Sequence, residues 1–251
     1  MKLHAVEVLY RERFGDHILI RYHWTGTIPE PGQFVMARTA ATSRRGFEPF
    51  LSRPLFAHDY DGETLSLLFE IRGRGTALLA SAEAGLLVSA PLGRGFALDS
   101  GPVALVGGGV WVSPLKLLAK RLVRSGTTRD VYLEIPGTAP KAYAAWISEN
   151  FPDATLVPTD GCKDPSQIVL SRLGDLTRYA TVYASGPAEM LAAVKQVTAG
   201  TVPAQLATRE RMACANGSCY GCAIPIWWRG ERTYVRACVE GPVFPAEVLA
   251  W

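Results

Sequence analysis

Four of the chain's five cysteines have a spacing that can hold an iron–sulfur cluster. Cys214, Cys219 and Cys222 form a C-x4-C-x2-C run, and Cys238 follows at a distance. This is the plant-type spacing for a [2Fe–2S] cluster, in which cysteine thiolates are the iron ligands. The N-terminus has no secretory pattern, which argues against disulfides and in favour of metal or redox chemistry. We therefore predict that these four cysteines bind a [2Fe–2S] cluster.

The residues between the cysteines are suited to a tight loop. Gly217 and Gly221 impose few steric limits, so backbone N–H groups can approach the sulfur atoms. The hairpin expected before Cys238 would return the fourth thiolate from the other side. A zinc site and purely structural cysteines remain as alternatives, although zinc sites prefer paired C-x2-C units and this chain has one. Cys162 stands outside the pattern and is expected to be a buried or loop thiol.

The composition is that of an ordinary globular protein, with 48% hydrophobic and 20% charged residues among 251. This length is enough for two small domains and an appendage. The net charge of +3 is too small to indicate nucleic-acid binding, and the basic residues are scattered apart from Arg44–Arg45. The N-terminus is charged, and no segment approaches the ~18 apolar residues of a membrane helix. We expect no signal peptide, no membrane span and a cytoplasmic protein.

Residues 1–99 have the pattern of a small antiparallel β-barrel. Short alternating segments predict strands, and turns that contain glycine, proline or aspartate separate them. One helix interrupts the series. The predicted strands cover residues 4–10, 17–24, 32–38 and 64–71, the turns cover 14–16, 29–32 and 60–63, and the helix covers 76–82.

Residues 100–204 alternate strands with helices, which predicts a Rossmann-like α/β nucleotide-binding domain with a parallel sheet. The predicted strands cover residues 102–108, 129–135, 154–160 and 180–186, and the helices cover 113–126, 139–151, 165–176 and 187–197. Residues 205–251 hold the cysteines and are too few to form an apolar core of their own. The predicted fold class is thus a multidomain α+β protein: a barrel, an α/β domain and a small C-terminal [2Fe–2S] domain.

Two short motifs in the barrel part could bind phosphate. Arg53 begins an Arg-Pro-Leu-Phe run and could make a charge-assisted contact. Gly73–Thr76 reads Gly-Arg-Gly-Thr and opens a helix, where free N–H groups favour a pyrophosphate. Each motif alone is more often an edge-strand position or an ordinary turn and helix cap.

The order of the motifs along the chain is that of a known superfamily. The motifs are PGQFV (31–35), RPLF (53–56), GRGT (73–76), PLGRGF (91–96), LVGGG (105–109), YASGPAEML (183–191), the cysteine run and CVEGPVF (238–244). With this order the chain resembles the ferredoxin reductase superfamily and, within it, the electron-transfer subunit of class 1B dihydroorotate dehydrogenase. The resemblance runs nearly end to end, and the cysteine spacing is its most specific part.

The resemblance implies an oxidoreductase subunit of pyrimidine biosynthesis. FAD would lie in the barrel, NAD(H) would bind beside it as co-substrate, and the [2Fe–2S] cluster would connect FAD with FMN in a catalytic dihydroorotate dehydrogenase subunit. The assembly would be a heterotetramer of two plus two subunits. Two other interpretations stay open: a related reductase subunit with another protein as donor or acceptor, and a non-catalytic module that holds zinc. The implied FAD contacts are Arg53, Pro54, Leu55, Phe56, Leu68, Phe69, Glu70, Gly75 and Thr76.

Several residues depart from the family pattern. Phe56 stands where the flavin motif has a serine, and Glu70 stands where an arginine is usual. Ser185 replaces a cysteine, and the usual acidic stretch is shortened to residues 159–161. The last glycine of the glycine-rich loop is replaced by Trp111, whose indole prevents the close backbone approach that glycine allows. We predict that Trp111 narrows or blocks the nicotinamide pocket, so that electrons arrive from, or leave to, another protein.

Overall fold

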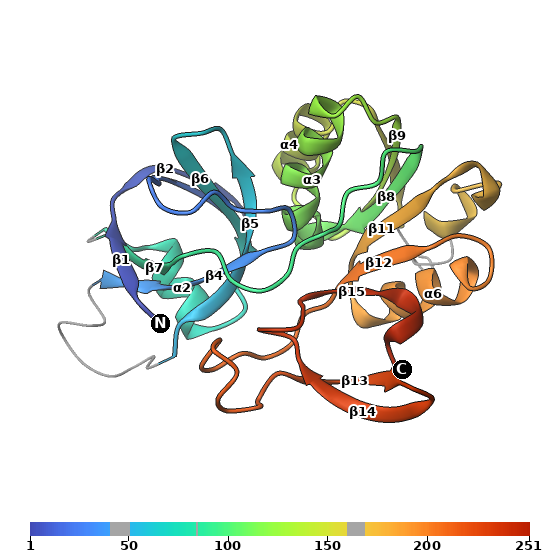
Figure 1. Cartoon of the computed structure of the whole chain (residues 1–251). Coiled ribbons are helices and arrows are strands. Elements are labelled where there is room, and N and C mark those ends of the chain that lie inside the picture. Colours follow the sequence, from blue (N-terminus) through green and yellow to red (C-terminus); the bar gives the residue numbers. More distant parts are fainter. Residues whose placement is uncertain (41–50, 84, 160–168) are drawn as a thin grey trace.

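The computed structural model describes residues 1–40, 51–83, 85–159 and 169–251. In Figure 1 the N-terminal barrel and the α/β part lie side by side, and the C-terminal segment runs below them. Four features of the sequence lie outside the described residues: Arg44–Arg45, residues 160–161, Cys162 and residues 165–168 of the helix predicted at 165–176. Among the described residues, no helix is long and apolar enough to cross a membrane.

Seven antiparallel strands form the barrel part, in the order β1-β7-β4-β5-β6-β3-β2. Only Glu7 separates β1 from β2, so the two edge strands of this sheet are consecutive in the chain. Apolar side chains such as Ile20, Val35 and Leu67 fill the interior. The strand bounds are β1 Leu3–Val6, β2 Val8–Phe14, β3 His17–His23, β4 Phe34–Thr39, β5 Arg53–Tyr60, β6 Thr64–Glu70 and β7 Leu86–Ser89.

The predicted antiparallel barrel is confirmed, with differences in its details. The turns after β2 and β5 contain Gly15 and Gly62, whose φ angles of 63° and 112° lie in the region that favours glycine. The single strand predicted at 4–10 is divided between β1 and β2, and β5 and β7 were not predicted as strands. β5 contains Pro54, which weakens a strand pattern, and β7 is too short to show alternation. Helix α2 (Arg74–Ala80) begins two residues earlier than predicted.

The α/β part is built on a sheet of six strands in the order β10-β9-β8-β11-β12-β15. The strands pair in parallel except for β15, and the order from β10 to β12 is that of a doubly wound nucleotide-binding fold. The strand bounds are β8 Val103–Gly108, β9 Arg129–Ile135, β10 Ala154–Pro158, β11 Thr181–Ser185, β12 Ala204–Ala207 and β15 Val243–Pro245. The helices are η1 Gly109–Val112, α3 Ser113–Arg124, α4 Lys141–Asn150, η2 Leu176–Arg178, α6 Ala188–Thr198 and η3 Ala246–Val248.

The C-terminal segment is joined to the α/β part more closely than a separate domain would be. Its strands β12 and β15 belong to the six-stranded sheet, while β13 (Ala223–Trp228) and β14 (Glu231–Arg236) form a hairpin of their own. Cys222 and Cys238 share an apolar core with Val182 of β11 and Phe34 of the barrel. The segment that was too small for its own core thus uses a common one. The boundaries after residues 99 and 204 stay predictions.

Candidate functional site

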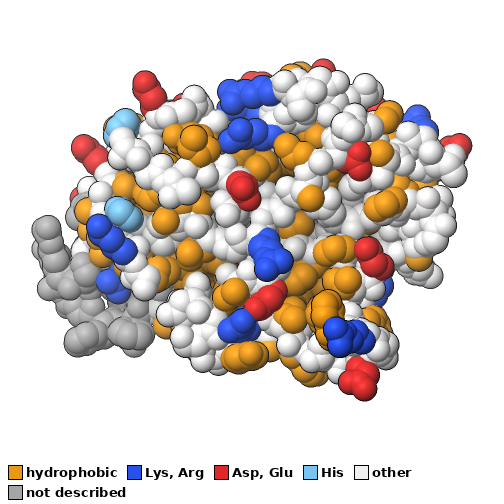
Figure 2. Space-filling view, in the orientation of Figure 1, with side chains coloured by type: hydrophobic (Ala, Val, Ile, Leu, Met, Phe, Trp, Pro, Cys, Tyr) orange, Lys and Arg blue, Asp and Glu red, His pale blue; other side chains and the backbone are white. Residues whose placement is uncertain are grey.

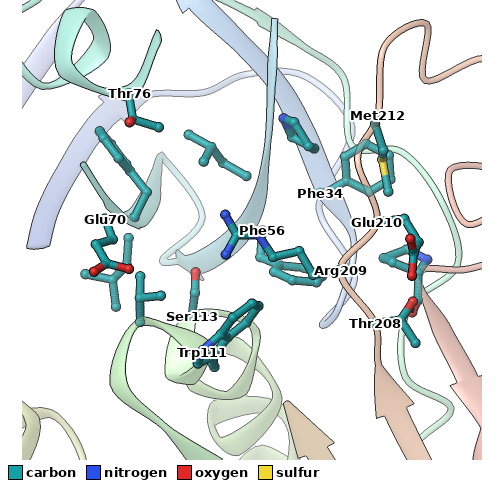
Figure 3. A pocket seen from close by; sticks show the side chains of 16 residues that line it. Phe34, Phe56, Glu70, Thr76, Trp111, Ser113, Thr208, Arg209, Glu210 and Met212 are labelled. Carbon is teal, nitrogen blue, oxygen red and sulfur yellow. Dashed lines mark hydrogen bonds between the residues drawn. The ribbon is translucent and has the colours of Figure 1, made fainter. Parts of the chain in front are cut away.

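A pocket of about 640 Å³, counting the space at its open mouth, lies where the barrel, the α/β part and the C-terminal segment meet; we call it the barrel cavity. Figure 3 shows its side chains, with Thr76 and Glu70 on one side and the C-terminal residues on the other. A cavity at a junction of domains, apolar with a few polar groups, is a usual small-molecule site. The lining residues are Phe34, Pro54, Leu55, Phe56, Leu68, Phe69, Glu70, Thr76, Val110, Trp111, Ser113, Thr208, Arg209, Glu210, Met212 and Pro242.

Seven of the nine residues implied as FAD contacts line the barrel cavity, and the other two, Arg53 and Gly75, pack against each other beside it. A Cβ atom at position 75 would overlap the Arg53 guanidinium, so the absence of a side chain makes room for this cation at the start of α2. Thr76 donates its hydroxyl to the carbonyl of Gly73 at 3.0 Å, which fixes the turn before the helix. Phosphate groups would find a positive charge and a helix start here.

The sequence motifs did not single out two polar groups of this cavity. Ser113 is 3% exposed, and its Oγ has no hydrogen-bond partner among the described residues, which is the state expected of a group that serves a ligand. Glu210 also lines the cavity, and burial raises the pKa of its carboxyl. Neither residue belongs to a recognisable motif, and the nearest signal is that residues 208–212 directly precede the first cysteine of the run.

The cysteine loop (Cys214–Cys222) has the backbone that a cluster requires. The N–H of Cys219 donates to the Sγ of Cys214, and the N–H of Gly221 donates to the Sγ of Cys219, both at 3.4 Å. Three residues of the loop have φ between 52° and 85°, namely Ala215, Gly217 and Tyr220. This left-handed backbone turns amide groups toward the sulfur atoms, as iron–sulfur proteins do.

The four thiols form two interacting pairs, Cys214 with Cys219 and Cys222 with Cys238. Backbone N–H groups, that of Asn216 first, lower the pKa of Cys214 to about 6, whereas burial raises the pKa of Cys238 to about 12. Two pairs of thiols are the arrangement that two irons, each with two cysteine ligands, would use.

The cysteine loop adjoins the barrel cavity. Met212 lines the cavity and stands two residues before Cys214. Phe34, which lines the same cavity, lies in one apolar core with Cys222 and Cys238. A ligand in the barrel cavity and a cluster in the cysteine loop would therefore be neighbours, as electron transfer between them requires.

A second pocket, of about 1150 Å³ counting the space at its open mouth, lies at the carboxyl edge of the six-stranded sheet; we call it the sheet-edge cavity. It is lined by the ends of β8 and β9 and by the turn between β2 and β3. Glu134, at the end of β9, is nearly buried and accepts a hydrogen bond of 3.0 Å from Thr159 Oγ1. A Cβ atom at Gly108 would come within 2.5 Å of the Glu134 Cβ, so these two strand ends pack closely. In doubly wound folds, dinucleotides bind at this edge.

Trp111 lies on the glycine turn (Gly107–Val112), which joins β8 to α3, and it lines both cavities. Its ring faces two cations: the Arg209 Cζ lies 4.8 Å and the Arg72 Cζ 5.6 Å from the ring centroid. Arg209 reaches this position from the C-terminal segment (Figure 3), where burial lowers the pKa of its guanidinium. The structure thus locates Trp111 between the two cavities rather than inside the sheet-edge cavity alone.

A flavin-type barrel, a doubly wound sheet and a four-cysteine loop together define the class of iron–sulfur reductases. Residues 209–250 match the family described as the iron–sulfur cluster binding domain of dihydroorotate dehydrogenase B. Over 246 residues the chain is 30% identical to the electron transfer subunit of dihydroorotate dehydrogenase B (NAD(+)) of Caldanaerobacter subterraneus subsp. tengcongensis, which covers 96% of this chain and 95% of the relative. The Bacillus caldolyticus subunit of the same name is 35% identical over 232 residues, covering 86% and 85%. The chain belongs to this family of electron-transfer subunits, as its motif order predicted.

Solved structures agree with the fold. The structure of an NADH-dependent reduced ferredoxin-NADP oxidoreductase superposes with a TM-score of 0.82 at 23% identity, covering 99% of this chain and 90% of that one. Phthalate dioxygenase reductase superposes with a TM-score of 0.62 at 16% identity, covering 94% and 77%. At these identities the likeness confirms the predicted three-part architecture and nothing more specific.

Proposed function

We propose that this chain carries electrons between NAD(H) and a catalytic dihydroorotate dehydrogenase subunit, through FAD in the barrel cavity and a [2Fe–2S] cluster on the four cysteines. When bound, FAD supplies the exchange between the two-electron chemistry of nicotinamide and the one-electron chemistry of the cluster. The chain's own contribution is to hold these groups side by side. One observation carries this proposal: the segment 208–212 lines the barrel cavity and leads directly into the cysteine loop.

Some residues of the barrel cavity would supply charge to FAD, and others would shape the space for its ring. Arg53 and the start of α2 would hold the pyrophosphate, because they supply the positive charge and backbone N–H groups of this region. Pro54, Leu55 and Phe56 would lie along the flavin ring, with Leu68 and Phe69 on the adjoining strand. Ser113 would donate or accept the hydrogen bond that its Oγ lacks within the described protein. Phe56, which replaces a serine, offers the ring an apolar face instead of a hydroxyl.

An exposed aromatic surface beside the cysteine loop supports docking of the catalytic subunit. Tyr220, Trp227, Trp228 and Tyr234, which we call the hairpin surface, are 48% to 61% exposed. Arginines lie over three of these rings at 5.3–5.8 Å. Figure 2 shows hydrophobic side chains exposed among charged ones over the lower part of the molecule, where the C-terminal segment lies. Exposed aromatic residues next to arginine are typical of protein interfaces.

We further infer that the catalytic partner carries FMN, that the complex contains two copies of each subunit, and that it works in the cytoplasm. The short path from the cysteine loop to the hairpin surface favours a partner whose own cofactor lies close to this face. Because the described part of each chain offers one such surface, pairing of two heterodimers through the catalytic subunits would give the heterotetramer.

The proposal is tested by anaerobic co-purification with the catalytic subunit of the same organism. The complex should contain FAD, FMN, iron and acid-labile sulfide, with iron and sulfide in equal amounts. Both dihydroorotate and NADH should bleach its visible absorbance. Trp227→Ala combined with Trp228→Ala should weaken the complex at least about tenfold by sedimentation, while the chain keeps its own iron and flavin. Oxygen-protected protein without iron, acid-labile sulfide or flavin would contradict the proposal.

A further inference from the structure

We propose that Trp111 is the wall between the barrel cavity and the sheet-edge cavity, and that it sets the access of the nicotinamide ring to the flavin. This inference rests on the proposed function, because it assigns FAD to one cavity and NAD(H) to the other. Hydride exchange requires the two rings to touch, so any group between the cavities controls the reaction.

Trp111 is positioned to act as this wall. Among the described residues, Glu70, Val110 and Trp111 line both cavities. Of the three, Trp111 has the largest side chain, and Glu70 is occupied by an ion pair of 2.6 Å with Arg72. A glycine at position 111 would leave the two cavities continuous at this point, whereas the indole separates them.

Arginines from two other parts of the molecule hold the indole ring. Arg72 precedes α2 in the barrel, and Arg209 belongs to the C-terminal segment. Their guanidinium carbons lie 5.6 Å and 4.8 Å from the ring centroid, distances at which a cation is attracted to an indole face. The ring is thus held by residues from both sides of the junction and does not hang freely into the solvent.

The backbone of the glycine turn is also fixed, within the turn at Gly109 and just past its end at Ser113. Tyr143 of α4 donates its hydroxyl to the Gly109 carbonyl at 2.8 Å, and its ring stacks on His17 of the barrel at 3.9 Å. His58 of β5 contacts the carbonyl of Ser113 at 2.9 Å through Nδ1. Movement of the whole turn would break these contacts, so the nicotinamide ring gains access when the indole side chain alone rotates aside.

A simple binding comparison follows from this arrangement. The ADP-ribose half of the dinucleotide fits in the sheet-edge cavity without crossing the wall, whereas the nicotinamide half must displace the indole. In the wild-type holoprotein, NAD⁺ should therefore bind no more tightly than ADP-ribose. In Trp111→Ala, ADP-ribose affinity should stay the same, and NAD⁺ should bind about tenfold more tightly than in the wild type.

The experiment is calorimetric titration of the oxidised holoprotein with NAD⁺ and with ADP-ribose, for the wild type, Trp111→Ala and Trp111→Phe. Trp111→Phe, which keeps a smaller ring and carries the test if the alanine variant fails to fold, should give an intermediate gain. The matched control is Trp251→Ala, which removes a tryptophan that lines neither cavity. In anaerobic stopped-flow measurements, bleaching of the flavin by NADH should become faster from the wild type to Trp111→Phe to Trp111→Ala.

The opposite result has a clear meaning. If Trp111→Ala binds NAD⁺ equally or less tightly than the wild type, the indole is a neutral neighbour or a stacking platform for nicotinamide, and the wall is refuted. Failure of the proposed function itself would be visible elsewhere, as wild-type protein without flavin or iron. The two failures are therefore distinguishable, because the wall is judged between variants whose flavin and iron contents are equal.

Discussion

The cysteine loop and the glycine turn are both tight backbone segments next to the barrel cavity, but they relate to the family pattern in opposite ways. The cysteine loop keeps its three cysteines and the glycines between them, and Cys238 supplies the fourth ligand from outside the loop. The glycine turn keeps its first three glycines and then places Trp111 where open space is expected. One segment binds by supplying atoms at fixed positions, and the other binds by leaving room.

This difference explains why one segment is preserved and the other has changed. A cluster needs all four sulfur atoms, so the loss of any one is close to all-or-none. The space beside a flavin can be filled by side chains of increasing size. Filling it changes the access of a ligand to the flavin without unfolding the protein. We therefore expect substitutions in the cysteine loop to abolish cluster binding. Substitutions around the glycine turn should change access to the flavin by degrees.

The largest effect is expected at Cys222, whose side chain is 2% exposed in the core shared with the barrel. Cys222→Ser should lose nearly all iron, because a hydroxyl does not ionise readily and is a poor iron ligand at this position. Iron and acid-labile sulfide measured after anaerobic purification check this. Cys162→Ser, which removes the cysteine outside the run, should retain both. If the Cys222→Ser protein kept its iron, the cysteine loop would tolerate gradual change. The contrast between this loop and the glycine turn would then be contradicted.

The next effect is a dependence of stability on pH through His58, which links the barrel to the end of the glycine turn. Burial lowers the pKa of His58 from 6.5 to about 4, with Asp59, Lys116 and Lys120 as the nearby charges. A histidine that is neutral when folded stabilises fully above its unfolded pKa, and this stabilisation is lost as the pH falls from 6.5 towards 4. The loss should reach about 3 kcal/mol at the lower limit.

The measurement is the free energy of unfolding in urea between pH 7 and 4 for the wild type and His58→Asn. The asparagine amide can still donate to the Ser113 carbonyl but does not titrate. The free energy of unfolding of His58→Asn should therefore fall less steeply as the pH is lowered. Burial also lowers the pKa of His17, so part of the slope should remain in the variant. Equal slopes in the two proteins would mean that His58 does not hold the junction.

A smaller, graded effect is expected from filling space at Gly75. Gly75→Ala should weaken FAD binding about tenfold, or about 1.4 kcal/mol, because the new Cβ displaces the Arg53 guanidinium. The protein should remain folded, since the displaced group is the end of a flexible side chain and alanine is favoured in a helix. Gly73→Ala is the matched control: its φ of 165° is extended, and a Cβ there meets no described atom within 4 Å. Flavin titration of both apoproteins checks the difference, and equal affinities would contradict it.

The sequence predicted what is encoded locally and missed what depends on the assembled fold. The cysteine spacing, the α/β alternation and the Arg53 and Gly75 motifs are short-range patterns, and the predicted strand at 129–135 coincides with β9. Strands β12 and β15 were not predicted, because their four and three residues carry no readable period, and their place in the sheet depends on the pairing of β12 with β11 and of β15 with β12.

The same limit applies to the site. Ser113, Thr208 and Glu210 belong to no motif, and they become site residues only because two domains and the C-terminal segment meet around one cavity. Trp111 was singled out from the sequence, yet the sequence indicated only that a glycine was missing. Its position between two cavities, and the arginines that hold it, required the tertiary structure.

The smallest effect is expected at Tyr143, and it decides whether the glycine turn is held in place or merely packed. Tyr143→Phe removes the hydroxyl that donates to Gly109 but keeps the ring on His17. The buried carbonyl loses its donor, which should lower the free energy of unfolding by about 1 kcal/mol. Tyr60→Phe is the matched control, since it removes an exposed bond of 2.7 Å to another glycine carbonyl, Gly62, that water can replace. If the two variants unfold at the same urea concentration, the turn draws no stability from Tyr143, and the indole at position 111 could then move together with its backbone.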